Sequence, residues 1–384
     1  MVKSLELKTV QLSEKTEKLR QEVRQFLKKE IQEGTFIPHC DSWLSNWDAE
    51  FSRKLGQRGW LGMTWPKQYG GHERSALERY VVTEELLAFG APVAAHWFAD
   101  RQTGPLFLRY GNEKQKNEFL PRIAQGEIYF SIGLSEPNSG SDLASISTNA
   151  KKIDGGWLLN GSKVWTSGAH LSHYMVTLCR TSTKTENRHE GLSQLIVDLS
   201  SSGVTVRPIK LMTGEHHFNE VFFEDVFVPD DRVVGTIGDG WKQSMAELAY
   251  ERSGPERFLS TFPLLVELIR VLQQEASNEI MKISVGRLVA RLTTLREMSL
   301  GVAGLLEKGV SPDVTAALVK DLGTKFECQI AEIARELVSY STRVSNLRFK
   351  SLLADALLHS PGFTLRGGTT EIIRGIIARG IGIR

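Results

Sequence analysis

Two polar segments near the middle of the chain carry residue types that can hold a flat, hydrogen-bonding ligand. The first is LSEPNSGSD at 134–142, and the second is LNGSKVWTSG at 159–168. Gly140 can adopt positive φ, so that neighbouring backbone N–H groups and hydroxyls face a polar ligand. Trp165 stands beside serine and threonine hydroxyls, a combination that suits a flat heterocycle. The alternative is a pair of ordinary β-turns with a core tryptophan.

A carboxylate near a proline marks a second candidate position, in AELAYERSGPERF at 246–258. Pro255 lacks an N–H and cannot donate to the carbonyl of residue 251, so the helix should kink beside Glu251. A kink next to a carboxylate can open a pocket beside it. Glu247, one turn earlier on the same face, is the nearest competitor, and Glu256 lies just past the kink. The alternative is a solvated helix charge.

The histidine pairs do not indicate a metal site. His170 and His173, like His216 and His217, have no third ligand at a defined spacing. The stretch GTIGDG at 235–240 is not the GxGxxG fingerprint and follows no βαβ pattern. We therefore expect neither a bound metal ion nor that dinucleotide-binding motif.

The first third of the chain predicts the helices that must position these residues. Residues 13–30 place leucine, valine and phenylalanine at helical spacing among charged residues, which gives one apolar stripe. Further helical stretches, separated by glycine and proline, are predicted at about 47–59, 74–89, 91–109 and 112–120. We therefore expect an all-helical N-terminal domain over residues 1–124.

The middle of the chain predicts strands. Segments such as IYFSIGLSE, HYMVTLCRTS, SQLIVDL and NEVFFEDVFV are short, rich in β-branched and aromatic residues, and bounded by turn residues. No helical pattern separates them, so we expect an antiparallel β-barrel or β-sandwich and not a βαβ sheet. This β domain is expected over residues 125–236.

Helical periodicity returns in the last part of the chain and continues almost to its end. Long helices are predicted near 240–274, 276–308 and 312–346, with a shorter helix after Gly367-Gly368. Helices of this length with short connections suit an antiparallel bundle over residues 237–384. The expected fold class is therefore α+β and multidomain, with an N-terminal all-helical domain, a middle antiparallel β-barrel or β-sandwich domain and a C-terminal antiparallel helical bundle.

Composition narrows the class of partner and compartment. The 384 residues carry 47 Lys and Arg against 45 Asp and Glu, a net charge of +2, without a sustained basic run. Neither nucleic acid nor an anionic membrane surface is therefore an expected partner. Three scattered cysteines, Cys40, Cys179 and Cys328, indicate a reducing compartment, and the N-terminus has no apolar signal segment. A cytoplasmic protein without a membrane span is expected.

Three segments together carry a family resemblance. LSEPNSGSD, LNGSKVWTS and the terminal GGTTEIIRGIIAR at 367–379 resemble the acyl-CoA dehydrogenase family in order and in approximate spacing, along nearly the full chain. The resemblance implies the same succession of helical, β and helical-bundle domains. It also implies a noncovalent FAD, with its isoalloxazine ring between the β domain and the bundle, and the formation of an α,β double bond in an acyl-CoA thioester.

The resemblance also implies a role for each residue of the first motif. By position, Leu134 and Ser135 resemble the family's contacts to the pyrimidine side of the flavin. Gly140 and Ser141 resemble its turn near the flavin diphosphate and the acyl-CoA.

Further cofactor contacts are implied in the second motif and in the last one. Trp165 would cover the flavin ring, and Ser167, where the family usually has Thr or Ser, would form a hydrogen bond near N5. Thr166 lies between them in the same cofactor-binding segment. Thr369 and Glu371 would match a late contact with the nucleotide half of FAD.

The implied chemistry removes a proton α to the thioester carbonyl, so a carboxylate must face the acyl chain. Many family members carry that Glu where this chain has Gly367, and a glycine cannot abstract a proton. The isovaleryl and long-chain types place Glu before Arg on the first long bundle helix, which matches Glu251-Arg252 here. Glu251 is therefore the expected base, and the backbone N–H of Gly367 can still help to stabilise the enolate.

Two motifs of the family are absent. Family homotetramers usually complete each FAD site with Arg-x-x-Phe and Gln-x-x-Gly-Gly segments from a neighbouring subunit. Here SNEIMKISVGRL occupies the first region, and residues 336–363, without a double glycine, occupy the second. One hypothesis is that a different, related subunit supplies the missing contacts in a heteromer. The other is a divergent homo-oligomer.

The expected partners are an acyl-CoA substrate and an electron-transfer flavoprotein or similar acceptor that reoxidises the FAD. Two other functions remain open. The chain could be a non-catalytic or half-site partner subunit of a heteromeric dehydrogenase, or a flavin oxidase or monooxygenase on the same scaffold. The position of the base does not determine the length or branching of the acyl group.

Overall fold

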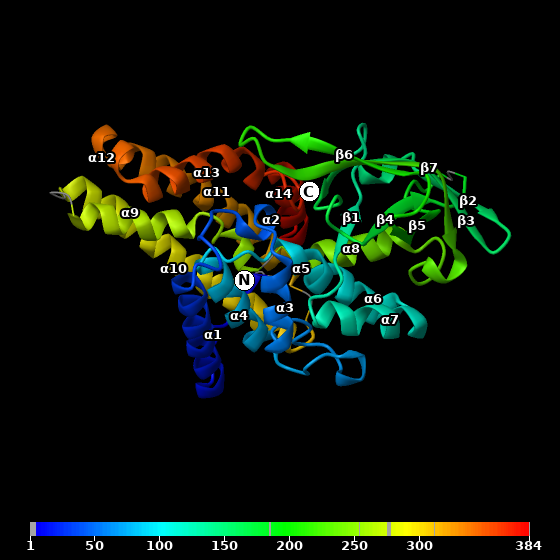
Figure 1. Ribbon diagram of the computed structural model, residues 1–384, viewed down its shortest axis with the longest axis horizontal. Coiled ribbons are helices and arrows are strands. Elements are labelled where there is room, and N and C mark those ends of the chain that lie inside the picture. Colours follow the sequence, from blue (N-terminus) through cyan, green and yellow to red (C-terminus); the bar gives the residue numbers. More distant parts are fainter. Residues whose placement is uncertain (1–4, 184–185, 253, 275–277, 311, 384) are drawn as a thin grey trace. The chain divides into compact units, whose positions relative to one another are not determined.

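The computed structural model describes residues 5–183, 186–252, 254–274, 278–310 and 312–383 (Figure 1). For residues 248–251, 340, 341 and 344 it describes the backbone alone. The chain folds into two compact units. The helical unit comprises Met1–Asn46, Ser75–Pro92 and Glu251–Arg384, and the β unit comprises Trp47–Arg74 and Val93–Tyr250.

The helical unit is built from helices that begin at local caps. Its helices are α1 (Glu14–Gln32), α2 (Ser42–Ser45), α4 (Ala76–Ala88), η6 (Pro255–Arg257), α9 (Phe262–Gln274), α10 (Glu279–Glu307), α11 (Asp313–Leu337), α12 (Tyr340–Ser345), α13 (Leu347–Phe363) and α14 (Thr370–Gly380). Ser75 and Glu78 form a capping box at the start of α4, and Asn278 caps α10 by accepting from Met281 N–H. These caps satisfy helix N–H groups that would otherwise have no partner.

Helix α11 is the centre of the helical unit. It packs against α9, α10, α13 and α14, and α4 packs against both α1 and α10 (Figure 1). The face that α11 buries is made largely of apolar residues, including Ala316, Ala317, Val319, Phe326 and Ile330. Burial of this face against several helices is what holds the bundle together.

The β unit contains one seven-stranded sheet with helices around it. Its strands are β1 (Phe130–Gly133), β2 (Asn149–Ile153), β3 (Gly156–Ser167), β4 (Tyr174–Arg180), β5 (Leu192–Asp198), β6 (Val204–Lys210) and β7 (His216–Pro229). Its helices are α3 (Ala49–Gln57), η2 (Lys67–Tyr69), α5 (Ala94–Phe98), η3 (Ala99–Thr103), α6 (Gly104–Tyr110), α7 (Glu113–Ala124), the short turns η4 (Leu143–Ser145) and η5 (Asp230–Arg232), and α8 (Gly240–Glu251), whose last residue belongs to the helical unit.

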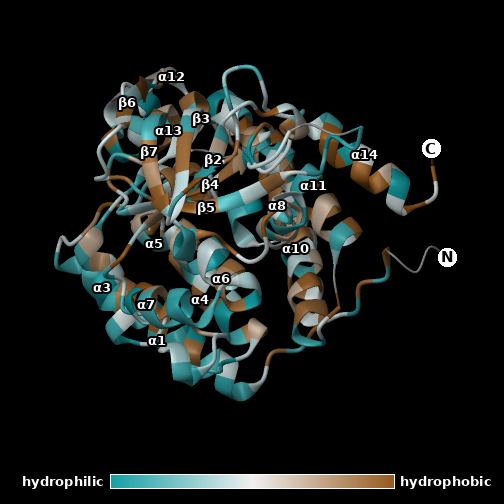
Figure 2. Cartoon of the chain, turned by 90° about the vertical axis from the view of Figure 1, so that its right-hand side faces the viewer, coloured by the Kyte–Doolittle hydropathy of each residue, from teal (hydrophilic) through white to brown (hydrophobic). Residues whose placement is uncertain are grey.

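The strand order is β1-β4-β2-β3-β7-β6, with β5 on the other side of β4. Most pairs are antiparallel, but β1 and β2 each pair with β4 in parallel. Strands β4 and β5 are buried along almost their whole length and are mostly hydrophobic (Figure 2). The sheet therefore has a core of its own, which includes Leu159, Val197, Val221 and Phe223.

The predicted fold class is confirmed, because helices precede and follow a β domain along the chain. The domain limits at 124 and 236 stay a prediction. The sequence did not predict the parallel pairs of β4, or α13, or the end of α11 at Leu337. Strand order depends on contacts between distant segments, which a local pattern does not record.

Among the helices formed by the described residues, none combines the length and the apolar character that crossing a bilayer requires.

Candidate functional site

The second polar motif interrupts the regular pairing of β3 with β7. The register shifts between Lys163 and Thr166, and Trp165 within the shift has a φ of +59°. In a regular strand every second residue faces the same side, so residue 165 would be buried like Leu159 and Lys163. The bulge changes this: Thr166 is buried instead, and Trp165 is 56% exposed. A bulky residue in this backbone region costs about 1–3 kcal/mol, and such strain clusters at ligand sites.

The indole of Trp165 is therefore available as a flat platform and is not part of the core. Its edge contacts the ring of Phe218 at 5.8 Å between centroids, which supports it from one side. Ser167 follows two residues later and is half-buried. Thr166 is buried; its carbonyl accepts a hydrogen bond from the side chain of Asn219 at 3.0 Å, and its hydroxyl has no partner among the described residues.

The structure brings the first motif alongside the second. The carbonyl of Ser135 accepts a hydrogen bond from Val164 N–H at 2.9 Å. The carbonyl of Leu134 accepts one from Lys163 Nζ at 3.0 Å. Because these contacts flank the bulge, Leu134, Ser135 and Trp165 lie in one neighbourhood of the sheet.

A buried ion pair, which the sequence reasoning missed, joins the two motifs. Lys163 Nζ lies 2.8 Å from Glu136 Oε1. The same carboxylate accepts from the backbone N–H groups of Ser147 and Thr148 and from the Ser147 hydroxyl. Burial would raise the pKa of Glu136, but the charge and hydrogen bond of Lys163, together with these donors, lower it to about 2.

A signal for this pair was present in the sequence. Alternation along β3 puts Lys163 on the same face as Trp157 and Leu159, so it had to be inside and had to have a partner. The first motif offers two carboxylates as partners, Glu136 and Asp142. The pair ties β3, at the start of the bulge, to the first motif and so helps to sustain the strained Trp165.

Gly140 and Ser141 lie in an exposed turn of the same unit. Backbone hydrogen bonds between Glu136 and Ser139 close the turn, at 2.8 Å and 3.0 Å. Gly140 does not adopt positive φ, contrary to the expectation, and a Cβ there would meet nothing within 4 Å. The turn therefore does not need a glycine for its own geometry, and the space beside it is open to a ligand.

The chain departs from helix beside Glu251 more completely than the predicted kink, because the single helix expected over 240–274 is two helices, α8 and α9. Helix α8 ends at Glu251 and η6 begins at Pro255, as expected from a proline without an N–H. The side chain of Glu251 lies outside the described residues. Of the two competing carboxylates, Glu256 is fully buried, and buried Glu247 accepts a hydrogen bond from Gln194 at 2.6 Å.

The last motif forms a tight turn before α14. Gly367 and Gly368 have φ of +70° and +98°, a backbone region that glycine adopts most easily. Arg252 Nε lies 3.4 Å from the carbonyl oxygen of Gly367, and the N–H of Gly367 has no hydrogen-bond partner among the described residues. The turn therefore offers a backbone donor in the same unit as residue 251.

The remaining predicted cofactor contacts lie at the start of α14. Thr369 caps this helix by accepting from Ile372 N–H at 3.5 Å. Glu371, in the first turn, has its pKa lowered by hydrogen bonds from its own backbone N–H and from Thr369. An anion at this position is favoured by the helix dipole.

The histidines do not gather into a metal site. His170 and His216 stack at 3.9 Å between ring centroids, and both contact the side chain of Asn219. No cluster of three or more metal-ligating side chains occurs within the ranges that the structure describes.

Comparison with family models covers nearly the whole chain. Models of the N-terminal, middle and C-terminal domains of acyl-CoA dehydrogenases match residues 13–127, 131–226 and 238–382. The similarity thus spans both compact units.

Two curated relatives of this chain are also acyl-CoA dehydrogenases. Acyl-CoA dehydrogenase FadE26 of Mycobacterium tuberculosis is 30% identical over 94% of this chain and 95% of its own length. Acyl-CoA dehydrogenase FadE34 of the same organism is 32% identical over 84% of this chain, which spans only 44% of the length of FadE34.

Solved structures share the fold. The Tcur3481-Tcur3483 steroid ACAD is 26% identical with a TM-score of 0.87, and the alignment covers 97% of this chain and 99% of the other. A chain of the ChsE4-ChsE5 complex from Mycobacterium tuberculosis is 28% identical with a TM-score of 0.83, covering 97% of each.

Proposed function

Because the chain belongs to the acyl-CoA dehydrogenase family, we propose that it is an FAD-dependent acyl-CoA dehydrogenase that forms an α,β double bond in an acyl-CoA thioester. The observation that carries this proposal is Trp165, which is strained, exposed and held at the bulge of β3. A fold without a ligand at this position would gain stability by burying the indole.

The residues around the bulge fit a flavin. The exposed face of Trp165 can cover the ring, and the backbone at Leu134 and Ser135, with the hydroxyl of Ser167, can form hydrogen bonds to its polar edge. When bound, FAD supplies the acceptor for the hydride from the β carbon. Thr369 and Glu371, at the start of α14, are the candidates for its nucleotide half.

Glu251 is the proposed base. A carboxylate is needed to take the α proton, and Gly367 has no side chain to supply it. Glu247 accepts a hydrogen bond from Gln194, and Glu256 is fully buried, so we assign the base to Glu251 and not to these two carboxylates. The N–H of Gly367 is the proposed donor to the thioester oxygen, where negative charge develops.

The test is anaerobic reduction of the bound flavin by a panel of acyl-CoAs: butyryl-, isovaleryl-, palmitoyl- and a cyclic acyl-CoA. We expect at least one to bleach the flavin, and Glu251→Gln to slow bleaching by about 10²- to 10⁴-fold with flavin content unchanged. The matched control is Glu247→Gln on the same helix, which should stay near the wild-type rate. Unchanged bleaching in Glu251→Gln would contradict the assignment of the base.

A second candidate is a heteromer with a related subunit that completes the FAD site. The family's neighbour-contact motifs are absent here, and the ChsE4-ChsE5 structure is a complex of two chains. The native mass and the flavin content of the purified chain test this hypothesis. Reoxidation of the reduced flavin by an electron-transfer flavoprotein or a similar acceptor is assayed separately. A homomer with one tightly bound FAD per chain would rule out the paired-subunit hypothesis.

A further inference from the structure

The backbone turn at Gly367 and Gly368 is held by cations on its carbonyl groups. The buried Lys320 of α11 donates through Nζ to the carbonyl oxygen of Gly368 and lies 3.4 Å from that of Thr364. Arg252 reaches the carbonyl oxygen of Gly367. Carbonyls that accept from charged donors form the stronger class of hydrogen bond, so the turn is held from three points.

The side chain that precedes the two glycines is anchored deep in the helical unit. Arg366 Nη1 lies 2.5 Å from Asp41 Oδ1, and Nη2 donates to the Ser260 hydroxyl at 2.9 Å. The guanidinium also lies over the ring of Trp43, at 4.4 Å, and over that of Phe363, at 4.7 Å. Two hydrogen bonds and two ring contacts therefore determine where residue 366, and the peptide after it, can lie.

Asp41 is itself held in a costly conformation. It is buried, and its φ of +55° is unusual for a residue other than glycine. It precedes α2, yet its side chain does not cap that helix; the carboxylate pairs with Arg366, and Oδ2 lies 3.2 Å from His359 Nδ1. Burial would raise the pKa of Asp41, but the charges and hydrogen bonds of Arg366 and His359 together outweigh burial and keep the pKa below its usual value.

Ser260 connects this cluster to α11. Its carbonyl accepts from Asp41 N–H at 2.8 Å, its N–H donates to Glu327 Oε1 at 2.7 Å, and its hydroxyl accepts from Trp43 Nε1 at 3.2 Å. Segments that are far apart in the chain thus meet under the turn. A cluster of this kind transmits a change at one member to the others because its groups are packed and hydrogen-bonded.

We propose that Asp41, through Arg366, and Lys320 are positioning residues that fix the Gly367–Gly368 turn so that the N–H of Gly367 points at the reacting thioester. The role of that N–H rests on the proposed function; the fixing of the turn does not. The chemistry tolerates little displacement of such a donor, since oxyanion contacts act only at hydrogen-bond distance.

The test compares three variants of the full chain with its flavin. Asp41→Asn and Lys320→Met each remove one charge that holds the turn. Glu84→Gln is the matched control: Glu84 is also a buried carboxylate of the same unit, paired with Arg20 at 2.6 Å and Arg296 at 2.7 Å. Hydrogen exchange of peptides covering 364–372, thermal unfolding, and kcat and KM with the acyl-CoA that bleaches the flavin fastest are measured for each.

All three variants should unfold at lower temperature. Only Asp41→Asn and Lys320→Met should speed exchange in 364–372, by about tenfold or more, and lower kcat by about 10- to 100-fold with a smaller change in KM. If residues 364–372 exchange as slowly in these two as in Glu84→Gln, the positioning proposal is overturned. If wild-type flavin is bleached by no acyl-CoA, the proposed function fails, and the exchange comparison still decides the positioning.

Should Asp41→Asn fail to fold, Lys320→Met still decides the question, because Lys320 donates directly to the carbonyl of Gly368. Arg366→Lys adds a graded case, since it keeps the charge but loses the fork that reaches both Asp41 and Ser260. Exchange in 364–372 should be intermediate in this variant, and exchange equal to wild type would count against the proposal.

Discussion

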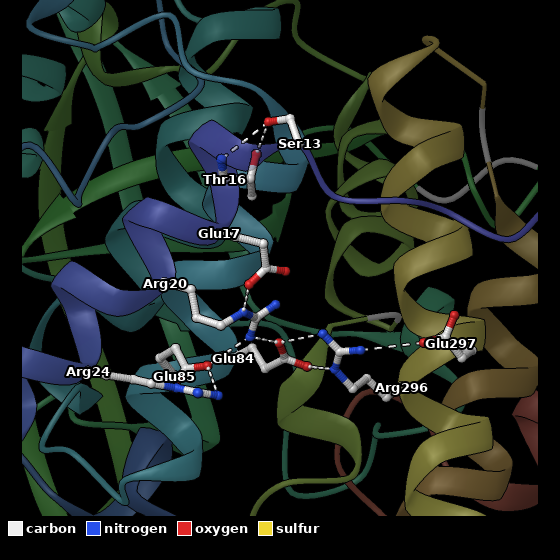
Figure 3. Close-up of polar contacts among 9 residues, drawn as sticks. All are labelled: Ser13, Thr16, Glu17, Arg20, Arg24, Glu84, Glu85, Arg296 and Glu297. Atoms are coloured by element: carbon white, nitrogen blue, oxygen red, sulfur yellow. Dashed lines mark hydrogen bonds and ion pairs between the residues drawn. The ribbon is translucent and has the colours of Figure 1, made fainter.

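Two arginine–carboxylate networks are buried in the helical unit, and they join different kinds of structure. In the first, which we call the helix network, Arg20 of α1 contacts Glu84 and Glu85 of α4, and Arg296 of α10 contacts Glu84 (Figure 3). In the second, which we call the turn network, Arg366 contacts Asp41 and Ser260, and the N–H of Ser260 donates to Glu327. The first joins the middles of regular helices, whereas the second joins irregular segments, one strained at residue 41 and one ahead of the glycine turn.

The networks also differ in how completely their carboxylates are paired. Glu84 and Glu85 each contact two arginines, with Arg24 as the second partner of Glu85 (Figure 3). In the turn network, Glu327 accepts from Ser260 N–H but lies 3.7 Å from the Arg366 guanidinium. Burial, opposed only in part by Arg366, raises the pKa of Glu327 to about 7. Both networks bury charged groups, so burial alone does not distinguish them. They differ in whether they join regular helices or irregular segments, and in whether each buried carboxylate has a close arginine partner.

The largest effect should come from breaking the helix network at its centre. Arg20→Met leaves the carboxylates of Glu84 and Glu85 buried with fewer partners, and we expect a loss of about 3–5 kcal/mol in the free energy of unfolding. Denaturant unfolding measures it. Hydrogen exchange in 364–372 should stay at the wild-type rate relative to global unfolding. If the free energy of unfolding falls by less than about 1 kcal/mol, Arg20 is not needed to hold the helix network together.

The second effect is a pH dependence specific to the turn network. Because the pKa of Glu327 is raised from 4.5 to about 7, the folded state keeps a proton that the unfolded state loses, so stability should fall as pH rises between these values. The fall amounts to roughly 3 kcal/mol. Glu327→Gln should remove it.

The measurement is the melting temperature at pH 5 and pH 8. The charge of Arg366 and the hydrogen bonds from Ser260 oppose the rise in the pKa of Glu327, whereas Asp41 adds to it as a second carboxylate. His359 contacts Asp41. Glu84→Gln in the helix network serves as the control and should keep the wild-type slope. A slope in Glu327→Gln as steep as in wild type would contradict the prediction.

A third experiment compares the pairing within each network by double-mutant cycles. Asp41→Asn with Arg366→Gln should show a coupling of about 1–3 kcal/mol, because the two side chains touch and are buried. Glu85→Gln with Arg24→Gln, where Arg24 is 43% exposed, should show less. If the two coupling energies were equal, the prediction that the buried Asp41–Arg366 pair couples more strongly than the half-exposed Glu85–Arg24 pair would be wrong.

The smallest effect is expected at the rim of the helix network. Glu297 lies 3.4 Å from Arg296 Nη1 and is exposed (Figure 3). Glu297→Ala should change the free energy of unfolding by less than about 0.5 kcal/mol, since solvent screens such pairs. Denaturant unfolding checks this. A loss of more than about 1 kcal/mol in the free energy of unfolding would show that Glu297 also contributes to the helix network.

Local patterns determined much of the fold. The apolar stripe of α1 and the change to short strand segments in the middle of the chain depend on neighbouring residues, and both are present. Pro255 also acts locally, but two helices stand where one kinked helix was predicted. Helical period, strand composition and a missing N–H act within a few residues, which is why a sequence displays them.

The candidate site was only partly predictable for the same reason. The sequence marked Trp165 as a ligand platform, but the bulge that exposes it depends on pairing with β7. The pair of Glu136 with Lys163 and that of Asp41 with Arg366 join residues 27 and 325 positions apart.

By itself, then, the sequence determined the order of helical and β domains and the motifs of an acyl-CoA dehydrogenase. Only the tertiary structure decided which charged groups are buried together, which residues carry strain and which carboxylate near α8 is already occupied. The physical reason is that burial and ion pairing depend on the packing of distant segments, whereas periodicity and turn chemistry are properties of adjacent residues.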